Sequence, residues 1–338
     1  MKFLEVPRPI SGGLILSYIC PIECKHCMYA CSPKWPKDWA SLNFIKKILD
    51  FFKNDILPAP EGSNRIGINY GLHFTGGEPF LNYKLLLDSI KIAKKLDIPS
   101  VFVETNCFWC KNDEITFEKF DTLKSEGLDG ILISVNPFIL EKIPFEYTQR
   151  AIKIAKNIFN NNLLVYQDIY YRIFKKLNIS GTIPFNNYLN IAYNSLLYAE
   201  LIPMGRLVYK LDFLYKKYPH TYFFKETCLN ELKRSWHVHF DNYGNYMAGY
   251  CGGITLGNLN NIDNIFNGID LDDKPILKAL TNNLESLFNF ATENYNYKPL
   301  DSGYISKCHL CVDIRKKIVQ ETSEFKELNP IEFYNNLI

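Results

Sequence analysis

The sequence carries no large excess of charge, because 38 Lys and Arg residues oppose 36 Asp and Glu residues and leave a formal net charge of +2. A balance this close gives no field that would make nucleic acid or an anionic membrane the main partner. The chain also lacks the run of about 18 uncharged apolar residues that a membrane helix needs. Its N-terminus has Glu5 and two prolines before any apolar run, which is unlike a signal peptide. We therefore expect a cytoplasmic protein that binds neither nucleic acid nor membrane.

The 10 cysteines in 338 residues are too few for a small scaffold built on many disulfides. The cysteines fall into three groups: Cys20, Cys24, Cys27 and Cys31; Cys107 and Cys110; and Cys228, Cys251, Cys308 and Cys311. In a reducing compartment, grouped cysteines favour metal binding over disulfide bridges. The sequence therefore has room for two metal sites.

Short apolar runs alternate with longer amphipathic segments over the first two thirds of the chain. The predicted strands cover residues 13–19, 66–74, 100–105, 130–135, 163–171 and 198–209. The predicted helices, with apolar residues at helical spacing, cover residues 40–54, 83–96, 113–127 and 145–159. Repeated strand and helix predict a parallel sheet with helices outside. Six such units would form a partial (β/α)6 barrel of the TIM type, whose reactive residues lie at the carboxyl ends of the strands.

The pattern changes in the last third of the chain. Residues 174–194 contain Asn, Gly and Pro, which predicts a loop or short insertion. Residues 237–251 predict a β-hairpin that turns at residues 241–244. We therefore expect an α/β partial barrel over residues 1–212 and a small second domain over residues 213–338 that ends in a helix.

Cys20, Cys24 and Cys27 follow the first predicted strand with the spacing C-x3-C-x2-C. Two kinds of metal site fit this stretch. One is a structural zinc with Cys31 as the fourth ligand. The other is a [4Fe–4S] cluster whose fourth iron has no protein ligand and can bind a substrate group.

A second motif, Gly76-Gly77-Glu78-Pro79, follows the second predicted strand. The glycines let the backbone approach a ligand closely, and Glu78 supplies an anionic acceptor. By itself, the stretch could equally be a turn from strand to helix with Pro79 near the helix start.

Together, the two motifs and the alternation of strand and helix resemble the radical S-adenosylmethionine enzymes over about residues 13–210. The resemblance implies that S-adenosylmethionine chelates the open iron and that one electron from the cluster cleaves it. The resulting 5′-deoxyadenosyl radical would abstract hydrogen from a substrate. Gly77 and Glu78, with Gly76 beside them, would then contact the methionine ammonium.

The resemblance extends to further cofactor-binding residues. Thr105 and Asn106 are similar to a Thr-Asn-Gly segment after the third strand, with Cys107 in place of the glycine. Ser134 matches a strand-four serine near the ribose or the methionine carboxylate, and His26 would contact adenine. The alternative for Thr105 and Ser134 is a strand-end hydroxyl that bonds to backbone.

The last cysteine group, Cys228, Cys251, Cys308 and Cys311, offers four thiolates, which suit a zinc ribbon or an iron–sulfur cluster. Within a chain that resembles radical S-adenosylmethionine enzymes, this group is similar to the auxiliary [4Fe–4S] domain of the SPASM or twitch type. The segment PMGR (203–206) is similar to the entrance of that domain. If all four cysteines bind, the cluster is closed and serves electron transfer or structure.

Enzymes with this pairing modify peptides by epimerisation, thioether formation or crosslinking, and some relatives dehydrogenate a sugar alcohol. Local similarity to peptide epimerases over residues 24–33, 74–83 and 105–109 makes a ribosomally made peptide the expected substrate. The resemblance also implies an electron donor of the flavodoxin or ferredoxin type. A small-molecule dehydrogenase and a non-catalytic iron–sulfur or zinc protein are the alternatives.

An epimerase of this kind needs a thiol that returns hydrogen to the substrate radical. Cys251 could be that donor or a cluster ligand, but not readily both. Cys31, Cys107 and Cys110 are the other candidates, and the last two follow the third predicted strand. The alternative for Cys107 and Cys110 is burial as small hydrophobic residues.

His237 and His239 alternate along one face of a predicted strand. We expect a structural role for both rather than metal binding.

Overall fold

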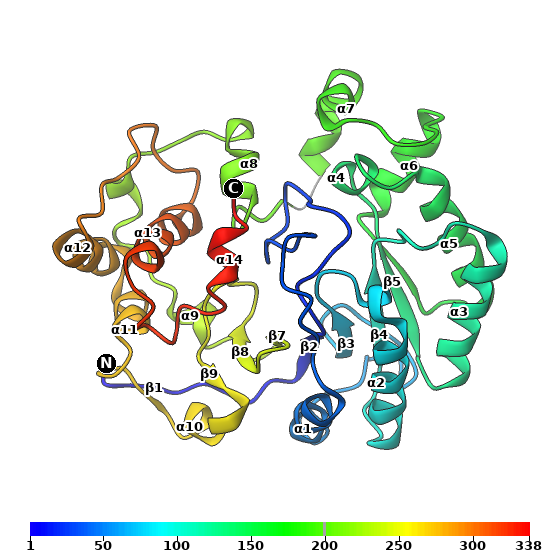
Figure 1. Ribbon diagram of the computed structural model, residues 1–338, viewed down its shortest axis with the longest axis horizontal. Coiled ribbons are helices and arrows are strands. Elements are labelled where there is room, and N and C mark those ends of the chain that lie inside the picture. The colour runs from blue at the N-terminus through cyan, green and yellow to red at the C-terminus, as the bar shows by residue number, and fades with distance from the viewer. Residues whose placement is uncertain (199–200) are drawn as a thin grey trace.

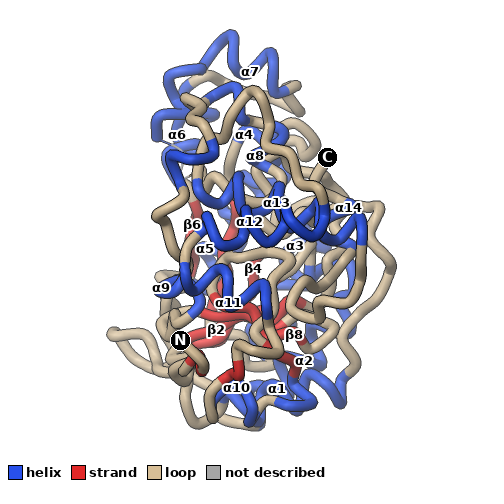
Figure 2. Tube along the Cα trace, turned by 90° about the vertical axis from the view of Figure 1, so that its left-hand side faces the viewer, coloured by secondary structure: helices blue, strands red, loops and turns tan. Residues whose placement is uncertain are grey.

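The computed structural model describes residues 1–198 and 201–338. Figure 1 shows two halves side by side, an N-terminal half of strands with helices outside and a C-terminal half that is mostly helical. In Figure 2 the strands lie in the interior of the molecule, and helices and loops surround them.

Five parallel strands form the N-terminal half. They are β2 (Ser11–Ile15), β3 (Gly71–Thr75), β4 (Val101–Thr105), β5 (Gly130–Ser134) and β6 (Leu163–Tyr166). Each strand pairs in parallel with the next one along the chain. Strands β2 and β3 are buried along their whole length, as strands of a parallel sheet covered on both faces are. The prediction of a parallel α/β sheet is confirmed.

The helices between these strands agree with the predicted ranges. They are α1 (Leu42–Phe52), α2 (Tyr83–Lys95), α3 (Asp113–Ser125) and α5 (Phe145–Phe159). Their buried residues recur at intervals of three and four, which is the helical period. Ser41, Asn82 and Asn112 begin α1, α2 and α3, and each side chain accepts a hydrogen bond from a backbone N–H of the first turn. These polar caps set the helix starts.

Two predictions for the segment after β5 are wrong. Residues 163–171 are not one strand, because β6 ends at Tyr166, Gln167 takes a left-handed φ of 62°, and α6 (Asp168–Lys176) begins. Tyr170 and Phe174 are both buried in α6, so the aromatic residues follow a helical period. Residues 174–194 contain helix α7 (Phe185–Ala192) and not only a loop.

The predicted sixth strand, residues 198–209, is also not found. Residues 199 and 200 lie outside the described residues. Residues 201–206 contain no strand, and the helix α8 (Leu207–Lys210) follows. The five parallel strands are therefore not extended at β6 by any described residue.

The sheet continues instead at its other edge, through the C-terminal half. The predicted hairpin is confirmed, since β7 (Val238–Phe240) pairs antiparallel with β8 (Asn245–Ala248). Strand β7 also pairs in parallel with β2, so the strand order is β6-β5-β4-β3-β2-β7-β8-β9, with β9 at Gly257–Asn258. Within the described ranges, β6 and β9 stay unpaired on their outer sides, and the barrel is open.

The remaining strands and α-helices that the structure describes make up a short second sheet and seven further helices. A second sheet pairs β1 (Phe3–Leu4) with β10 (Ile269–Asp270). The other helices are α4 (Pro137–Leu140), α9 (Leu229–Leu232), α10 (Asp263–Phe266), α11 (Pro275–Asn282), α12 (Leu284–Tyr295), α13 (Lys307–Glu321) and α14 (Glu332–Asn335). A division between domains at residue 212 stays a prediction.

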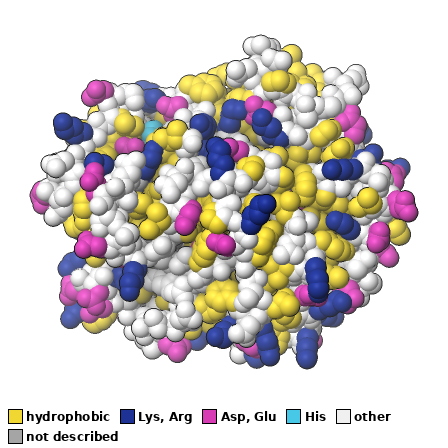
Figure 3. Space-filling view, in the orientation of Figure 1, with side chains coloured by type: hydrophobic (Ala, Val, Ile, Leu, Met, Phe, Trp, Pro, Cys, Tyr) yellow, Lys and Arg dark blue, Asp and Glu magenta, His cyan; other side chains and the backbone are white. Residues whose placement is uncertain are grey.

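The distribution of charged side chains on the surface agrees with the nearly equal numbers of basic and acidic residues in the sequence. Figure 3 shows Lys and Arg side chains interspersed with Asp and Glu over one face of the molecule. Among the described residues, every helix is too short or too polar to cross a bilayer.

A buried arginine holds the loop that carries the first cysteine group. Arg206 is only 1% exposed. Its guanidinium donates hydrogen bonds to the carbonyl oxygens of Cys24, Ala30 and Cys31 at distances of 2.6 to 3.1 Å. Its Nε donates to the carbonyl oxygen of Asn336 at 3.0 Å. One side chain thus ties the cysteine loop to the C-terminal end of the described chain.

We predict that Arg206→Met lowers the free energy of unfolding of the cluster-free protein by at least about 3 kcal/mol, because several buried carbonyls lose their donor. Urea unfolding followed by circular dichroism measures this change. The matched control is Arg172→Met, since the side chain of Arg172 is 77% exposed and pairs only with Asp168 on its own helix. The control should cost less than about 1 kcal/mol, and equal losses in the two variants would contradict the assignment.

Candidate functional site

One cavity of about 420 Å³ lies at the carboxyl ends of the parallel strands. Its walls contain all the residues predicted for the first cluster and the cofactor, together with Cys31. These are Cys20, Cys24, His26, Cys27, Cys31, Gly76, Gly77, Glu78, Thr105, Asn106 and Ser134. They meet because they lie at or after the carboxyl ends of four neighbouring parallel strands, β2 to β5, at the same edge of the sheet.

The thiols of the cysteine loop have polar neighbours. The backbone N–H of Cys31 donates to Sγ of Cys27 at 3.3 Å, and a hydrogen bond with the Cys31 thiol lowers the pKa of Cys27 to about 6. Burial raises the pKa of Cys20, whose Sγ accepts a hydrogen bond from Nδ2 of Asn106 at 3.6 Å. N–H donors of this kind stabilise thiolates, the form of cysteine that binds metal.

The glycine pair brings two loops into contact. A Cβ on Gly76, which has φ of 130°, would overlap the carbonyl oxygen of Ser17, and one on Gly77 would overlap that of Ile19. The backbone N–H of Gly77 donates to the Ser17 carbonyl at 2.8 Å, and that of Glu78 donates to the Ile19 carbonyl at 3.1 Å. The glycines are therefore needed for packing against the segment that leads to Cys20, a backbone contact that sequence reasoning missed.

Glu78 is the centre of a hydrogen-bond network. Its carboxylate accepts from the backbone N–H of Asn106 at 2.8 Å, from Oγ1 of Thr105 at 3.0 Å and from the backbone N–H of Phe80 at 3.2 Å. Burial raises the pKa of Glu78 to about 7, against the lowering effect of these donors. Since a carboxylate offers about four acceptor positions, one position is left toward the cavity.

Thr105 supports Glu78. Its hydroxyl donates to Glu78 and accepts from Nε1 of Trp109 and from the backbone N–H of Cys107, both at 3.1 Å. A hydroxyl has one donor and two acceptor positions, so these bonds occupy it fully. The side chain of Thr105 therefore positions Glu78, whereas Ser134 lies at the end of β5 in the cavity wall.

His26 presents an unpaired ring nitrogen. Its ring stacks on Phe138 with centroids 4.6 Å apart, and Nε2 lies 3.4 Å from Nδ2 of Asn136. Its Nδ1 is buried, and no described residue forms a hydrogen bond with it. Burial lowers the pKa of His26 to about 4, so the ring is neutral at neutral pH. A buried polar atom of this kind is a group that a bound ligand would satisfy.

Cys107 and Cys110 are fully buried, and neither is part of the described wall of the cavity. Cys107 has φ of 64°, a left-handed conformation that costs glycine little. This conformation explains why the similar Thr-Asn-Gly segment has glycine at the same position. The two thiols are placed in the core and not at the reacting face.

The last cysteine group also comes together. Cys228 precedes α9, Cys251 follows β8, and Cys308 and Cys311 lie near the start of α13. The thiol of Cys228 interacts electrostatically with the other three. The guanidinium of Arg315 is buried and contacts Cys311. A buried cation beside these thiols offsets the negative charge that bound thiolates would bring.

The polar residues of the cavity wall that sequence reasoning missed include His73 and Glu104. Glu104 accepts a hydrogen bond from Oγ1 of Thr75 at 2.7 Å, and its Oε1 lies 3.7 Å from Nε2 of His73. Burial raises the pKa of Glu104 to about 7. The available signal was a titratable residue inside an otherwise apolar strand, in β3 for His73 and in β4 for Glu104.

Comparison with solved structures gives distant similarities. The structure titled native anSMEcpe with bound AdoMet is 12% identical, with 97% of this chain and 96% of that chain covered at a TM-score of 0.45. BtrN in complex with AdoMet and 2-DOIA is 11% identical, with 82% and 89% covered at 0.41. Streptococcus suis SuiB bound to precursor peptide SuiA is 11% identical, with 90% and 76% covered at 0.34.

Comparison with curated proteins finds no match to the sequence. The profile of one protein family, described as the Radical SAM superfamily, matches residues 14–171. The matched range contains Cys20, Cys24 and Cys27 together with the Gly76–Gly77 pair, and it runs from β2 into α6. Residues 14–171 therefore belong to the radical S-adenosylmethionine (radical SAM) superfamily.

Proposed function

We propose that the chain is a radical SAM enzyme that abstracts hydrogen from a peptide. The observation that carries the proposal is the shared cavity, which the C-x3-C-x2-C cysteines, the Gly-Gly-Glu-Pro turn and Ser134 all line. Motifs far apart in the sequence meet at the edge of the sheet where this fold carries out chemistry.

The cavity residues fit an iron–sulfur cluster and S-adenosylmethionine. Cys20, Cys24 and Cys27 would hold three irons of a [4Fe–4S] cluster and leave the fourth open. Such a cluster, once reduced, supplies a 5′-deoxyadenosyl radical from bound S-adenosylmethionine. The remaining acceptor position of Glu78 would orient the methionine ammonium, and Nδ1 of His26 would bond to the adenine.

The backbone and hydroxyl groups of the wall would complete the nucleotide site. Gly76 and Gly77 are half-buried and line the cavity beside Glu78. Asn106 donates one hydrogen bond to Glu78 and another to Sγ of Cys20. It would therefore fix the position of the ammonium site relative to the cluster. Ser134 would bond to the ribose or to the methionine carboxylate.

The spacing of the cysteines favours clusters over zinc. Thiolates around one zinc lie about 3.8 Å apart, because Zn–S bonds of about 2.3 Å point to the corners of a tetrahedron. Within the described residues, no three cysteine Sγ atoms all lie within 4.8 Å of one another; three histidine nitrogens do. Wider spacing suits a cube in which each thiolate binds a different iron.

We assign residues 213–338 to an auxiliary domain whose closed [4Fe–4S] cluster is held by Cys228, Cys251, Cys308 and Cys311. The proximity of the four thiols and the adjacent Arg315 support this assignment. Cys251 would then be a ligand and not the hydrogen donor. A flavodoxin or ferredoxin would supply electrons to the protein.

We propose epimerisation as the reaction, with Cys31 as the thiol. Among the described residues, Cys31 is the only cavity-lining cysteine outside the C-x3-C-x2-C motif. Its S–H would give a hydrogen atom to the substrate carbon radical, which forms a C–H bond and leaves a thiyl radical. One electron from the reducing partner and one proton then restore the thiol.

We expect anaerobically reconstituted protein to convert S-adenosylmethionine to 5′-deoxyadenosine when dithionite is added. Cys24→Ala should lower this rate by more than about 100-fold. Removing a residue that only contacts a metal ligand lowers activity by up to about 100-fold, and removing a ligand itself should cost more. The matched control, Cys110→Ala, removes a thiol that lies outside the cavity wall and should keep the activity. Chromatography of the nucleoside product measures the rate. A wild-type protein that binds iron and sulfide but forms no 5′-deoxyadenosine would refute the proposal.

We expect a peptide substrate treated in heavy water to gain one deuterium at the modified carbon, because the thiol of Cys31 exchanges with solvent. Cys31→Ala should abolish this incorporation while 5′-deoxyadenosine is still formed, and Cys107→Ala should leave it unchanged. Mass spectrometry of the peptide measures the label. A product lighter by two hydrogen atoms would instead identify a dehydrogenase, and loss of label in Cys107→Ala alone would assign the donor to Cys107.

A further inference from the structure

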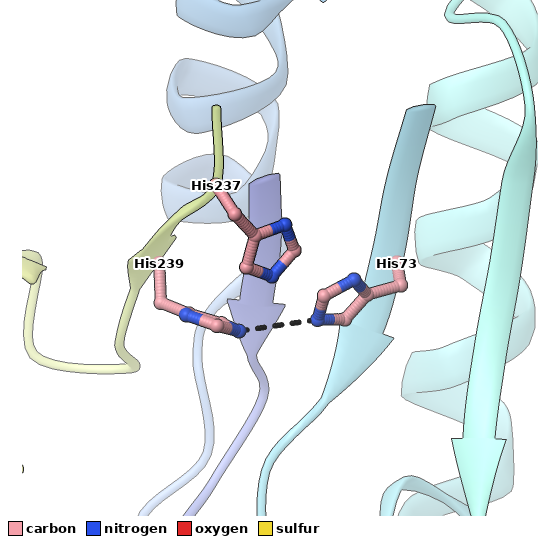
Figure 4. A group of neighbouring side chains, drawn as sticks. All are labelled: His73, His237 and His239. Atoms are coloured by element: carbon pink, nitrogen blue, oxygen red, sulfur yellow. Dashed lines mark hydrogen bonds between the residues drawn. The ribbon is translucent and has the colours of Figure 1, made fainter. Parts of the chain in front are cut away.

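Three buried histidines from two strands meet in the wall of the cavity. His73 lies on β3, and His237 and His239 lie at and beside the start of β7 (Figure 4). One ring nitrogen of each lies within 4.8 Å of the others, and Nε2 of His73 is 3.1 Å from Nε2 of His239. Nitrogen ligands with bonds of about 2.0 to 2.1 Å to one metal ion lie about 2.9 to 3.4 Å apart. The closest pair therefore already has the spacing of two ligands of one ion.

The register of the sheet produces this cluster. Gly13 of β2 is the pairing partner of His73 on one side and of His239 on the other. A Cβ at Gly13 would overlap Nε2 of His73 and lie 2.6 Å from Cδ2 of His239. Because residues two apart in a strand point to the same face, His237 joins His239 there. A glycine in the middle strand thus makes the space in which imidazoles from both neighbours meet.

Hydrogen bonds on the outer side hold two of the rings. Nδ1 of His239 lies 3.3 Å from the carbonyl oxygen of Gly249 and 3.1 Å from the hydroxyl of Tyr29. In the tautomer in which Nδ1 donates its proton to that carbonyl, Nε2 has its lone pair free for a metal ion. Nδ1 of His237 lies 3.1 Å from Oγ of Ser11. Metal-binding histidines are held in this way, with the second ring nitrogen bonded to a carbonyl or hydroxyl group.

The rings are also in the protonation state that binds metal. Burial lowers the pKa of His73, His237 and His239 below its ordinary value, so all three are neutral at neutral pH. Without an ion, at most one hydrogen bond can form between the Nε2 atoms of His73 and His239. The carboxyl group of Glu104 lies 3.7 Å from Nε2 of His73. Because burial raises its pKa to about 7, it adds negative charge beside the cluster once it is ionised.

We propose that His73, His237 and His239 bind a divalent transition-metal ion, best matched by Zn²⁺, with a coordination position open toward the cavity. Three histidines with one open position are typical of zinc sites that bind a water or a substrate oxygen. This geometry favours ligation over the structural role expected for His237 and His239 from the sequence. On the basis of the proposed function, the ion would fix a carbonyl or carboxylate oxygen of the peptide opposite the nucleotide residues.

The test uses the reconstituted holoenzyme with its clusters oxidised, so that the cysteines hold iron and do not compete for the probe. The protein is stripped of loose metal on a chelating resin, equilibrated with Zn²⁺ and analysed for zinc, iron and sulfide. We expect the wild-type protein to bind about one zinc per chain more than the histidine variants described next. His237→Gln and His239→Gln should each remove that zinc at unchanged iron and sulfide content. The matched control, His220→Gln, removes a histidine that stacks on Phe288 away from the cavity and should retain the zinc.

Two further measurements keep the result interpretable if a histidine variant folds poorly. Ser11→Ala removes only the hydroxyl beside His237 and should weaken zinc binding about 10- to 100-fold. Co²⁺ in the wild-type site should give a high-spin electron paramagnetic resonance signal without sulfur ligation. Wild-type holoenzyme that takes up no additional zinc, or zinc uptake that is equal in the two histidine variants and the control, overturns the proposal. None of these readouts uses cleavage of S-adenosylmethionine, so failure of the metal site and failure of the proposed reaction are distinguishable.

Discussion

The structure depends on the buried guanidinium of Arg206, which binds the backbone of the cysteine loop. This loop cannot be held by apolar packing alone, because its carbonyl groups need donors once they are buried. Arg206 supplies several N–H groups from one rigid plane and also bonds to Asn336 near the end of the chain. The chain must therefore be folded almost to its last residues before the loop has its final shape. The shape of the cysteine loop and the folding of the C-terminal half are coupled in this way.

The loop after β3 likewise uses a few residues to contact two other loops. Gly76 and Gly77 allow it to lie directly on the segment that leads to Cys20, and Glu78 then reaches the loop after β4 through Thr105 and Asn106. Asn106 in turn donates to Cys20. Three loops from three strands are connected by hydrogen bonds before any ligand binds. A site arranged in advance loses little conformational entropy on binding, which favours precise placement of a reactive group.

Two sets of residues with different chemistry line the cavity. One contains the cysteines, Glu78 and Ser134, which follow the strands at their carboxyl ends. The other contains the three histidines, which lie within or beside the strands. Under the proposed function, a peptide bound in this cavity would contact both the nucleotide and the proposed metal ion. Such an arrangement restrains a substrate radical at two points, and a restrained radical has fewer side reactions.

Much of this architecture is encoded locally. The helices α1, α2, α3 and α5 agree with prediction because their apolar residues recur at intervals of three and four, a pattern set within a turn or two. Polar caps add to this at the starts of α1, α2 and α3. Prediction failed at residues 163–171, where aromatic residues suit strand and helix alike. A left-handed residue, Gln167, separates β6 from α6 there. Residues 198–209 failed as a strand in their described part because apolar composition alone does not provide a pairing partner.

The sequence by itself determined the cysteine spacing, the glycine turn and the alternation of strand and helix, since each of these is a pattern of near neighbours. Only the tertiary structure decided that Arg206 donates hydrogen bonds to the cysteine loop, that the Thr105 hydroxyl donates to Glu78, and that Cys107 and Cys110 are buried in the core. It also decided the histidine cluster, because His73 and His239 are 166 residues apart and meet only where β3 and β7 pair with opposite sides of β2. Contacts of that kind depend on which strands become neighbours, and strand pairing is set by the packing of the whole sheet and not by any local run of residues.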